Sequence, residues 1–264
     1  SNPKKYPQLT VNREAACAAC HPSGGSDGSA WATMEGERRT MGLWGGVAGR
    51  GWLHQSASHK NADEFVRTIV AERLGGVMTG AEDFAALADY LAHGIPKLQT
   101  PKVDAALADR GRQLFQRQCS GCHAGEKYTS GRPSGSDPLG GGEDGGPGLF
   151  DLGTASDNDH VVLGPLFTSM LPPMAKQAFD LTRGDRKLGT GDPLQLQLNF
   201  RQRPDRARGQ FKAPSLINTW ENVLFFHDGR FDQLADAVSY LNDKLAAGLS
   251  ADDQKAIVEF LRTL

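Results

Sequence analysis

Apolar residues recur at helical spacing in four stretches of the chain, which predicts a mostly α-helical protein. The predicted helices cover residues 63–74, 82–93, 104–118 and 251–264. Gly75-Gly76 ends the first helix and Gly94 ends the second, because glycine commonly follows the last helical turn. Helices are therefore expected to form most of the fold.

Glycine and proline divide this helical pattern into two parts. Residues 96–103 have the composition of a linker and separate a first domain, residues 1–95, from a second domain, residues 104–264. Inside the second domain, residues 124–210 form a long Gly-rich insertion. Loops of this length without periodic apolar positions predict irregular structure.

Composition and charge exclude some classes of function. The 264 residues are 39% hydrophobic and carry a formal net charge of −2, so the total charge does not indicate binding to nucleic acid or to an anionic membrane surface. No run of about 18 apolar residues exists, which excludes a membrane-spanning helix. The low apolar content is compatible with a core that is completed by a bound cofactor.

A C-x-x-C-H motif occurs twice and uses all four cysteines. The two copies are Cys17-Ala18-Ala19-Cys20-His21 and Cys119-Ser120-Gly121-Cys122-His123. This pattern is the attachment signature of c-type haem, because two cysteines three positions apart on a helical turn can reach both vinyl groups. We therefore expect two covalently bound haem c groups, with the cysteines as attachment points and the histidines as proximal iron ligands.

Two alternatives exist for the cysteine pairs, a redox dithiol and a zinc site. A zinc centre would need the four cysteines together and would leave both histidines unexplained. The chain begins at Ser1 without an initiator Met or an apolar leader, which we interpret as a mature product after removal of a signal peptide. Because bacteria attach haem c outside the cytoplasm, the expected location is the periplasm.

The two halves share a weak internal repeat. Laid over each other without a gap, residues 39–43 meet residues 212–216, and His54 meets His227. We expect these two histidines to support the haem surroundings rather than to bind iron.

Residues 211–216 and 226–231, together with the second C-x-x-C-H, resemble the C-terminal haem domain of bacterial di-haem cytochrome c peroxidases and their MauG-like relatives. The resemblance implies two cytochrome c-like domains, a periplasmic location, and either peroxide reduction or oxidation of a protein substrate. The second half is also similar to small class I cytochromes c. That similarity implies that Gly111 and Phe115 cross the terminal helix at Phe260.

Two positions depart from the peroxidase pattern. The family's Met or Tyr ligand in the helix after the H-D-G-R segment falls on Leu241, and no catalytic Glu in a Pro-rich segment precedes the linker. The expected fold is thus mostly α, with two cytochrome c-like haem domains and the insertion in the second.

The sixth ligand of each haem decides its chemistry, because Met favours electron transfer and an open position allows peroxide activation. In the second half the candidates are Met170 and Met174, which flank two prolines, and Met174 is favoured. In the first half Met78 is narrowly favoured. The other candidates there are Met34, Met41, His54 and His59.

The expected function is electron transfer between a donor and a small redox partner protein. A peroxidase or MauG-like oxidase is the alternative, which leaves open whether the chain is an enzyme. A third hypothesis keeps electron transfer and has iron(II) as the electron donor, because acidic side chains on the insertion offer oxygen ligands to a hard cation. Those residues are Asp137, Glu143, Asp144, Asp151, Asp157 and Asp159.

Overall fold

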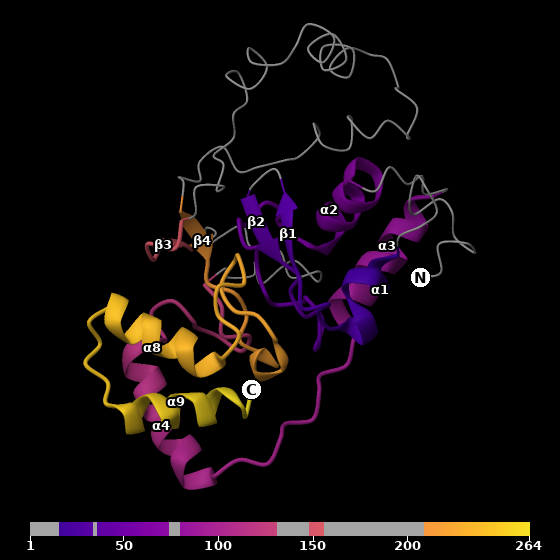
Figure 1. Ribbon diagram of the computed structural model, residues 1–264. Helices are drawn as coiled ribbons and strands as arrows, with labels where there is room; N and C mark the ends of the chain where they lie inside the picture. The colour runs from indigo at the N-terminus through magenta and orange to yellow at the C-terminus, as the bar shows by residue number, and fades with distance from the viewer. Residues whose placement is uncertain (1–15, 34–35, 74–79, 131–147, 156–208) are drawn as a thin grey trace, which may run out of the picture.

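A computed structural model describes residues 16–33, 36–73, 80–130, 148–155 and 209–264. The longer elements are α1 (Cys17–Cys20), β1 (Ala30–Thr33), β2 (Gly36–Arg39), α2 (Ala62–Arg67), α3 (Ala81–Asp89), α4 (Ala105–Gln118), β3 (Leu149–Asp151), β4 (Gln210–Lys212), α8 (Leu234–Lys244) and α9 (Ala251–Leu261). Single turns of 3-10 helix are η2 (Pro22–Gly24) and η5 (Thr219–Glu221), and π-helical turns are η3 (Thr68–Arg73) and η4 (Tyr90–Gly94). Helices form most of the regular secondary structure in the described part, as the sequence predicts (Figure 1).

The four predicted helices are confirmed, although α9 ends at Leu261 and not at Leu264. Side chains cap the beginnings of three of them, whereas α3 begins after Gly80, which has no side chain to cap it. Asn61 accepts from the Glu64 N–H at the start of α2, and Asp104 does the same for α4. Ser250 forms a capping box at the start of α9. α2 continues into η3 and α3 into η4, so that each pair together spans one predicted helix. The Gly75-Gly76 stop lies outside the described residues.

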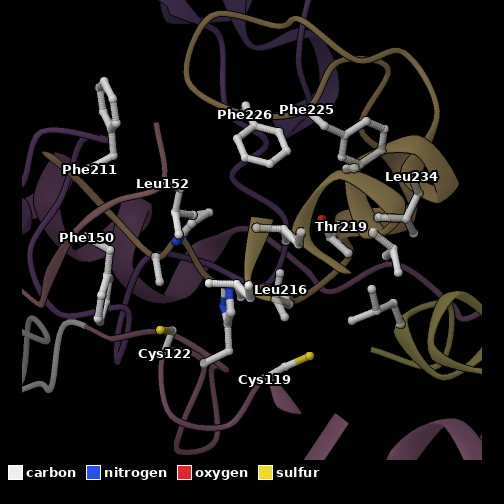
Figure 2. Close-up of a pocket in the computed structure, with 18 of the residues that line it drawn as sticks. Cys119, Cys122, Phe150, Leu152, Phe211, Leu216, Thr219, Phe225, Phe226 and Leu234 are labelled. Atoms are coloured by element: carbon white, nitrogen blue, oxygen red, sulfur yellow. The ribbon is translucent and has the colours of Figure 1, made fainter. Parts of the chain in front are cut away.

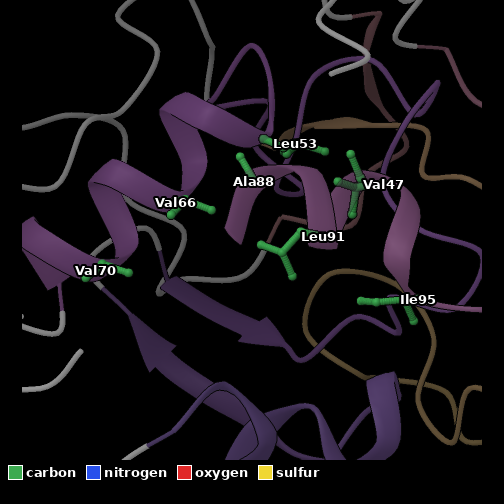
Figure 3. Close-up of a cluster of buried hydrophobic side chains, with 9 residues drawn as sticks. Val47, Leu53, Val66, Val70, Ala88, Leu91 and Ile95 are labelled. Atoms are coloured by element: carbon green, nitrogen blue, oxygen red, sulfur yellow. The ribbon is translucent and has the colours of Figure 1, made fainter. Parts of the chain in front are cut away.

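One hydrophobic cluster lies where α2 packs against α3 and η4 (Figure 3). Val66 is buried on α2 and Val70 on η3, and Ala88 and Leu91 face them from α3 and η4. Val47, Leu53 and Ile95 complete the cluster from the connecting loops. All of these residues precede the predicted linker.

The second hydrophobic cluster is built on the crossing of α4 and α9, as the class I cytochrome similarity implies (Figure 1). A Cβ placed on Gly111 would lie 1.9 Å from the Ala256 carbonyl oxygen, so only glycine permits this approach. The Phe115 and Phe260 rings meet with centroids 5.2 Å apart. Outside the core, Arg110 forms an ion pair of 2.7 Å with an aspartate of α9.

Residues 96–103 run between these clusters without helix or strand in the described structure (Figure 1). The Leu98 N–H donates to the Asn218 side chain at 3.2 Å, which ties this segment to the second half. The division of the chain into two domains at this segment stays a prediction. No described helix is long and apolar enough to cross a membrane.

The sequence analysis predicted none of the four strands found among the described residues. β1 pairs with β2 and β3 pairs with β4, each pair antiparallel. The expectation of irregular structure over the whole insertion is therefore wrong for residues 149–151, which form β3, and for Gln210, which begins β4. Strands of three or four residues are too short to show alternation in a sequence.

The structure corrects the repeat by one residue in its second part. Leu53 forms an isolated bridge with His59, and Phe225 forms the equivalent bridge with Phe231. The residue directly after Leu53 and the residue directly after Phe225 both have a left-handed backbone conformation: His54 has φ 64° and Phe226 has φ 62°. His54 therefore corresponds to Phe226 rather than to His227.

The crossing predicts the effect of Gly111→Ala. Helix propensity alone would favour alanine by about 1 kcal/mol. The clash with the Ala256 carbonyl reverses this gain, and we expect a net loss of about 1–3 kcal/mol in the free energy of unfolding. Urea unfolding measures it. Gly121→Ala is the matched control, because no atom lies within 4 Å of its added Cβ. Equal stability of the two variants would contradict the close crossing.

Candidate functional site

The second C-x-x-C-H segment lies at the end of α4 and faces a largely apolar pocket, here called the His123 pocket. Cys119, Cys122 and His123 all line it. The His123 N–H donates to the Cys119 carbonyl at 2.9 Å, so the segment continues the helical turn that places the three side chains together. Figure 2 shows the two cysteines along one side of the pocket and Phe225 and Phe226 on the opposite side.

Residues from distant parts of the chain close the His123 pocket. α8 contributes Leu234 and Leu241, and α9 contributes Ile257 and Leu261. The insertion contributes Phe150, next to β4 (Figure 2). A flat apolar group could be buried here on both of its faces.

The ring of His123 is oriented for ligation through Nε2. Its Nδ1–H donates to the Tyr128 carbonyl oxygen at 3.0 Å, which leaves Nε2 as the acceptor nitrogen. Burial lowers the pKa of His123, against the opposing effect of the carbonyl hydrogen bonds. The imidazole is therefore neutral near pH 7, which is the form that binds a metal ion.

A second pocket, here called the His21 pocket, has the same arrangement of its histidine. The His21 Nδ1–H donates to the Gly25 carbonyl oxygen at 3.1 Å, and burial lowers the pKa of His21. His21 lines the pocket, whereas Cys17 and Cys20, on α1 just before it, are not among its described lining residues. The two C-x-x-C-H segments thus present their histidines alike and their cysteines differently.

The cysteines do not have the environment of a reactive dithiol. Burial raises the pKa of Cys119 to about 11 and also raises that of Cys122 and of Cys20. Redox-active cysteines need the opposite shift. All four cysteines lie in the described part of the chain, where no three His, Cys, Asp or Glu side chains gather as a metal-ion site. Neither alternative for the cysteine pairs is therefore supported.

The donor set fits a c-type haem. Each site offers a neutral imidazole, with Nδ1 bonded to a carbonyl oxygen, that follows two thiols in helical spacing. Each histidine lines a pocket, and the His123 pocket has largely apolar walls whereas the His21 pocket also has basic side chains in its wall. Thioether formation consumes the thiols, so their suppressed ionisation within the folded chain is no obstacle.

Four residues line both pockets and form what we call the shared wall. These are Arg39, Gln55, Lys212 and Pro214. The Arg39 N–H donates to the His227 carbonyl at 2.7 Å, and the Lys212 N–H donates to the Gln55 carbonyl at 2.8 Å. Each half thus pairs its backbone with a loop of the other half, and one layer of side chains separates the pockets.

Most of the predicted distal ligands lie outside the described residues. These are Met34, Met78, Met170 and Met174. Met41 and His54 do line the His21 pocket. The Nδ1 atoms of His54 and His59 each lie 3.0 Å from the Ser58 hydroxyl oxygen, and His59 is fully buried behind the pocket.

His227 lies in the His123 pocket, where its ring stacks on Phe211 with centroids 3.8 Å apart and an interplanar angle of 11°. This face-to-face packing supports the expectation of a structural role. Leu241, at the family's ligand position, lines the same pocket and has no atom that can bind iron.

Sequence reasoning missed the residues that join the two pockets. Arg39 and Lys212 fall on matching positions of the repeat and are both basic, which is a signal that could have drawn attention to them. No sequence pattern marked Phe150 and Leu152 as pocket residues, because they lie in a segment without apolar periodicity.

The fold and the site define a class: a mostly helical protein with two adjoining pockets, each with the histidine of a C-x-x-C-H motif in its wall. No protein-family model matches the chain, and no curated protein matches it. Solved structures do share its fold.

One such structure is hydrazine synthase of Kuenenia stuttgartiensis, at 19% identity and a TM-score of 0.56, covering 97% of this chain and 83% of that one. Another is a MauG-like protein associated with microbial copper homeostasis, at 16% identity and a TM-score of 0.59, covering 97% and 84%. The TM-scores show a common fold, and at identities this low the similarity shows the fold alone.

The Asp228–Arg230 pair beside His227 predicts a pH-dependent stability. Burial would raise the pKa of Asp228, but the Arg230 guanidinium, 2.7 Å away, and the neighbouring His227 hold it below its usual value. Its stabilising effect is therefore complete above the unfolded-state pKa of about 3.9 and is lost as the pH falls through the lower folded-state value. We expect Asp228→Asn to cost about 1.5–3 kcal/mol at neutral pH, because it removes a charged hydrogen bond.

Urea unfolding at several pH values measures this difference. The gap between Asp228→Asn and the unsubstituted protein should close below about pH 4. Asp232→Asn, at an exposed position four residues along, is the control and should show no such gap. A gap that stays constant down to acid pH would contradict the assigned pairing.

Proposed function

We propose that this chain is a periplasmic di-haem cytochrome c that transfers electrons between a donor and a redox partner protein. Residues 1–95 would hold one haem and residues 104–264 the other, with residues 96–103 as the linker. The similarity of its fold to that of a MauG-like protein supports a haem protein of this superfamily. The partners that fit a one-electron carrier are small redox proteins.

The residues of each site have separate tasks in this proposal. Cys17 and Cys20, and Cys119 and Cys122, would hold the two macrocycles, and His21 and His123 would bind the irons through Nε2. When bound, each haem supplies an iron that accepts and releases one electron. The carbonyl partners of the histidine Nδ1 atoms fix the ring orientation and the tautomer.

The observation that carries the proposal is the shared wall. Because Arg39, Gln55, Lys212 and Pro214 each face both pockets, two bound cofactors would be separated by a single layer of side chains. A donor could deliver an electron at one pocket and an acceptor could take it at the other. No substrate needs to reach either iron.

A MauG-like oxidase or a peroxidase is the second candidate, and one feature of the His123 pocket favours it. None of the described residues that line this pocket is a methionine, and Leu241 occupies the family's ligand position. Unless Met170 or Met174 reaches the iron, a sixth position would be free for peroxide.

Iron(II) as the electron donor has less support. Of the acidic residues expected to bind it, only Asp151 lies in the described part, and its Oδ1 accepts from the Gly153 N–H at 2.8 Å. This contact closes a turn and indicates no cation site.

Haem attachment is tested by mass spectrometry of the chain expressed with a c-type maturation system. We expect two haems, each held by two thioethers. In Cys119→Ala the second haem should be held by one thioether or lost, and thermal unfolding should show the larger loss of stability in the second hydrophobic cluster, which contacts Cys119. Ser120→Ala, between the two cysteines, is the control and should retain both haems. Two doubly attached haems in Cys119→Ala would refute the assignment.

Absorption and EPR spectra separate the two candidate functions. An electron carrier with both sixth positions filled should be low-spin when oxidised and when half-reduced, and peroxide and cyanide should leave its spectra unchanged. A high-spin haem that appears on half-reduction and binds cyanide would instead establish the oxidase or peroxidase. Met170→Leu and Met174→Leu, compared in the near infrared, then show which methionine is a ligand.

A further inference from the structure

Three cationic side chains are buried around the two pockets. Arg39 is 8% exposed, and Arg50 and Lys212 are each 7% exposed. All three line the His21 pocket, and Arg39 and Lys212 also line the His123 pocket. A buried charge is costly unless an opposite charge lies close to it.

Among the described residues, the hydrogen-bond partners of the Lys212 side chain are neutral oxygens of the other half. Its Nζ donates to the Arg50 carbonyl at 2.7 Å and to the Trp52 carbonyl. An ammonium group has three N–H donors, so these two bonds leave one for another acceptor. Burial, and then the positive charge of Arg50, lower the pKa of Lys212 to about 7.

Arg39 is placed in the same way from the first half. Its Nε donates to the Phe226 carbonyl at 2.7 Å and its Nη1 to the Thr40 carbonyl at 3.4 Å. A guanidinium has five N–H donors, so more than half of them are not used by these contacts. Burial lowers the pKa of Arg39 to about 10.

Arg50 completes the positive cluster in the His21 pocket. Its Nη1 and Nη2 donate to the carbonyls of Gly42 and Trp44, at 3.0 and 2.6 Å, and its buried Nε has no hydrogen-bond partner. Carbonyl oxygens satisfy hydrogen bonds but do not neutralise a charge. Within the described residues, no carboxylate contributes to the pKa of any of these three cations.

We propose that Arg39 and Lys212 form one carboxylate-binding site in the shared wall, occupied by the carboxylate groups of the two bound haems. The inference rests on the proposed function and adds which residues recognise the cofactor's anionic edge. A haem is apolar except at its two propionate carboxylates, and the charged residues that line both pockets here are cations. Arg50 supplies further positive charge on the side of the His21 pocket.

The site couples the two cofactors, because each cation belongs to one half and bonds to the backbone of the other. Arg39, from the first half, bonds to the Phe226 carbonyl, and Lys212, from the second, bonds to the Arg50 carbonyl. Removal of either charge therefore acts on both haems. A positive charge beside a haem favours its reduced state, so the loss of Lys212 lowers both reduction potentials.

The test is a spectroelectrochemical titration of the full holoprotein and of Lys212→Met, which keeps the length of the side chain without its charge. Both potentials should fall by at least the equivalent of a tenfold change in the reduction equilibrium, about 59 mV for one electron. Lys212→Arg should restore them towards the original values. Lys102→Met is the control, because Lys102 is exposed and lies away from both pockets. Unchanged potentials in Lys212→Met, or a fall at one haem alone, overturn the shared site.

Two further measurements distinguish a failure of this inference from a failure of the proposed function. The unsubstituted protein should have the same potentials in chloride and in phosphate buffer of equal ionic strength, since the haem carboxylates already fill the site. Reduction potentials that differ between the two buffers would show that Arg39 and Lys212 bind an anion from solution and not the haem carboxylates. This result would overturn the inference even if Lys212→Met does not fold. The mass of the protein reports haem attachment separately, so two covalent haems with unshifted potentials reject this inference and leave the proposed function intact.

Discussion

The structure depends on a reciprocal backbone contact between the two halves of the chain. The Arg39 N–H donates to the His227 carbonyl, and the Lys212 N–H donates to the Gln55 carbonyl. Each contact inserts a basic residue of one half into a loop of the other and buries its charge. The two pockets share a wall because of this exchange, and the proposed passage of electrons between them depends on that shared wall.

The features that the sequence predicts well are local or rest on a single close approach. The four predicted helices follow from apolar spacing, although α8 was not among them. The C-x-x-C-H segments place a cysteine pair and a histidine within two turns of backbone. Gly111 is the long-range exception, because the missing Cβ permits the helix crossing and marks it in the sequence. The helices and their crossing could therefore be predicted from a few residues, whereas the roles of the cysteines and histidines stay a proposal.

The shared wall could not be predicted in the same way. Lys212 and Arg39 bond to residues 160 or more positions away, and no local pattern encodes such a pairing. The gapless alignment of the repeat matched His54 with His227, yet the backbone conformation shows that His54 is equivalent to Phe226. A weak repeat shows which segments of the two halves correspond. The loop of the second half is one residue shorter than that of the first, so the residue-by-residue alignment shifts by one within the repeat. The hydrogen bonds and the left-handed backbone positions of the structure reveal this shift, and the sequence does not.

The rate of electron exchange between the two haems tests the central claim most directly. Less than one electron per molecule is delivered rapidly to the oxidised holoprotein, and the absorbance of each haem is followed as the electron redistributes. Two cofactors across one layer of side chains should equilibrate within the molecule, at a rate that is the same when the protein is diluted tenfold. A rate that falls in proportion to protein concentration would show that electrons move only between molecules, and would contradict the account.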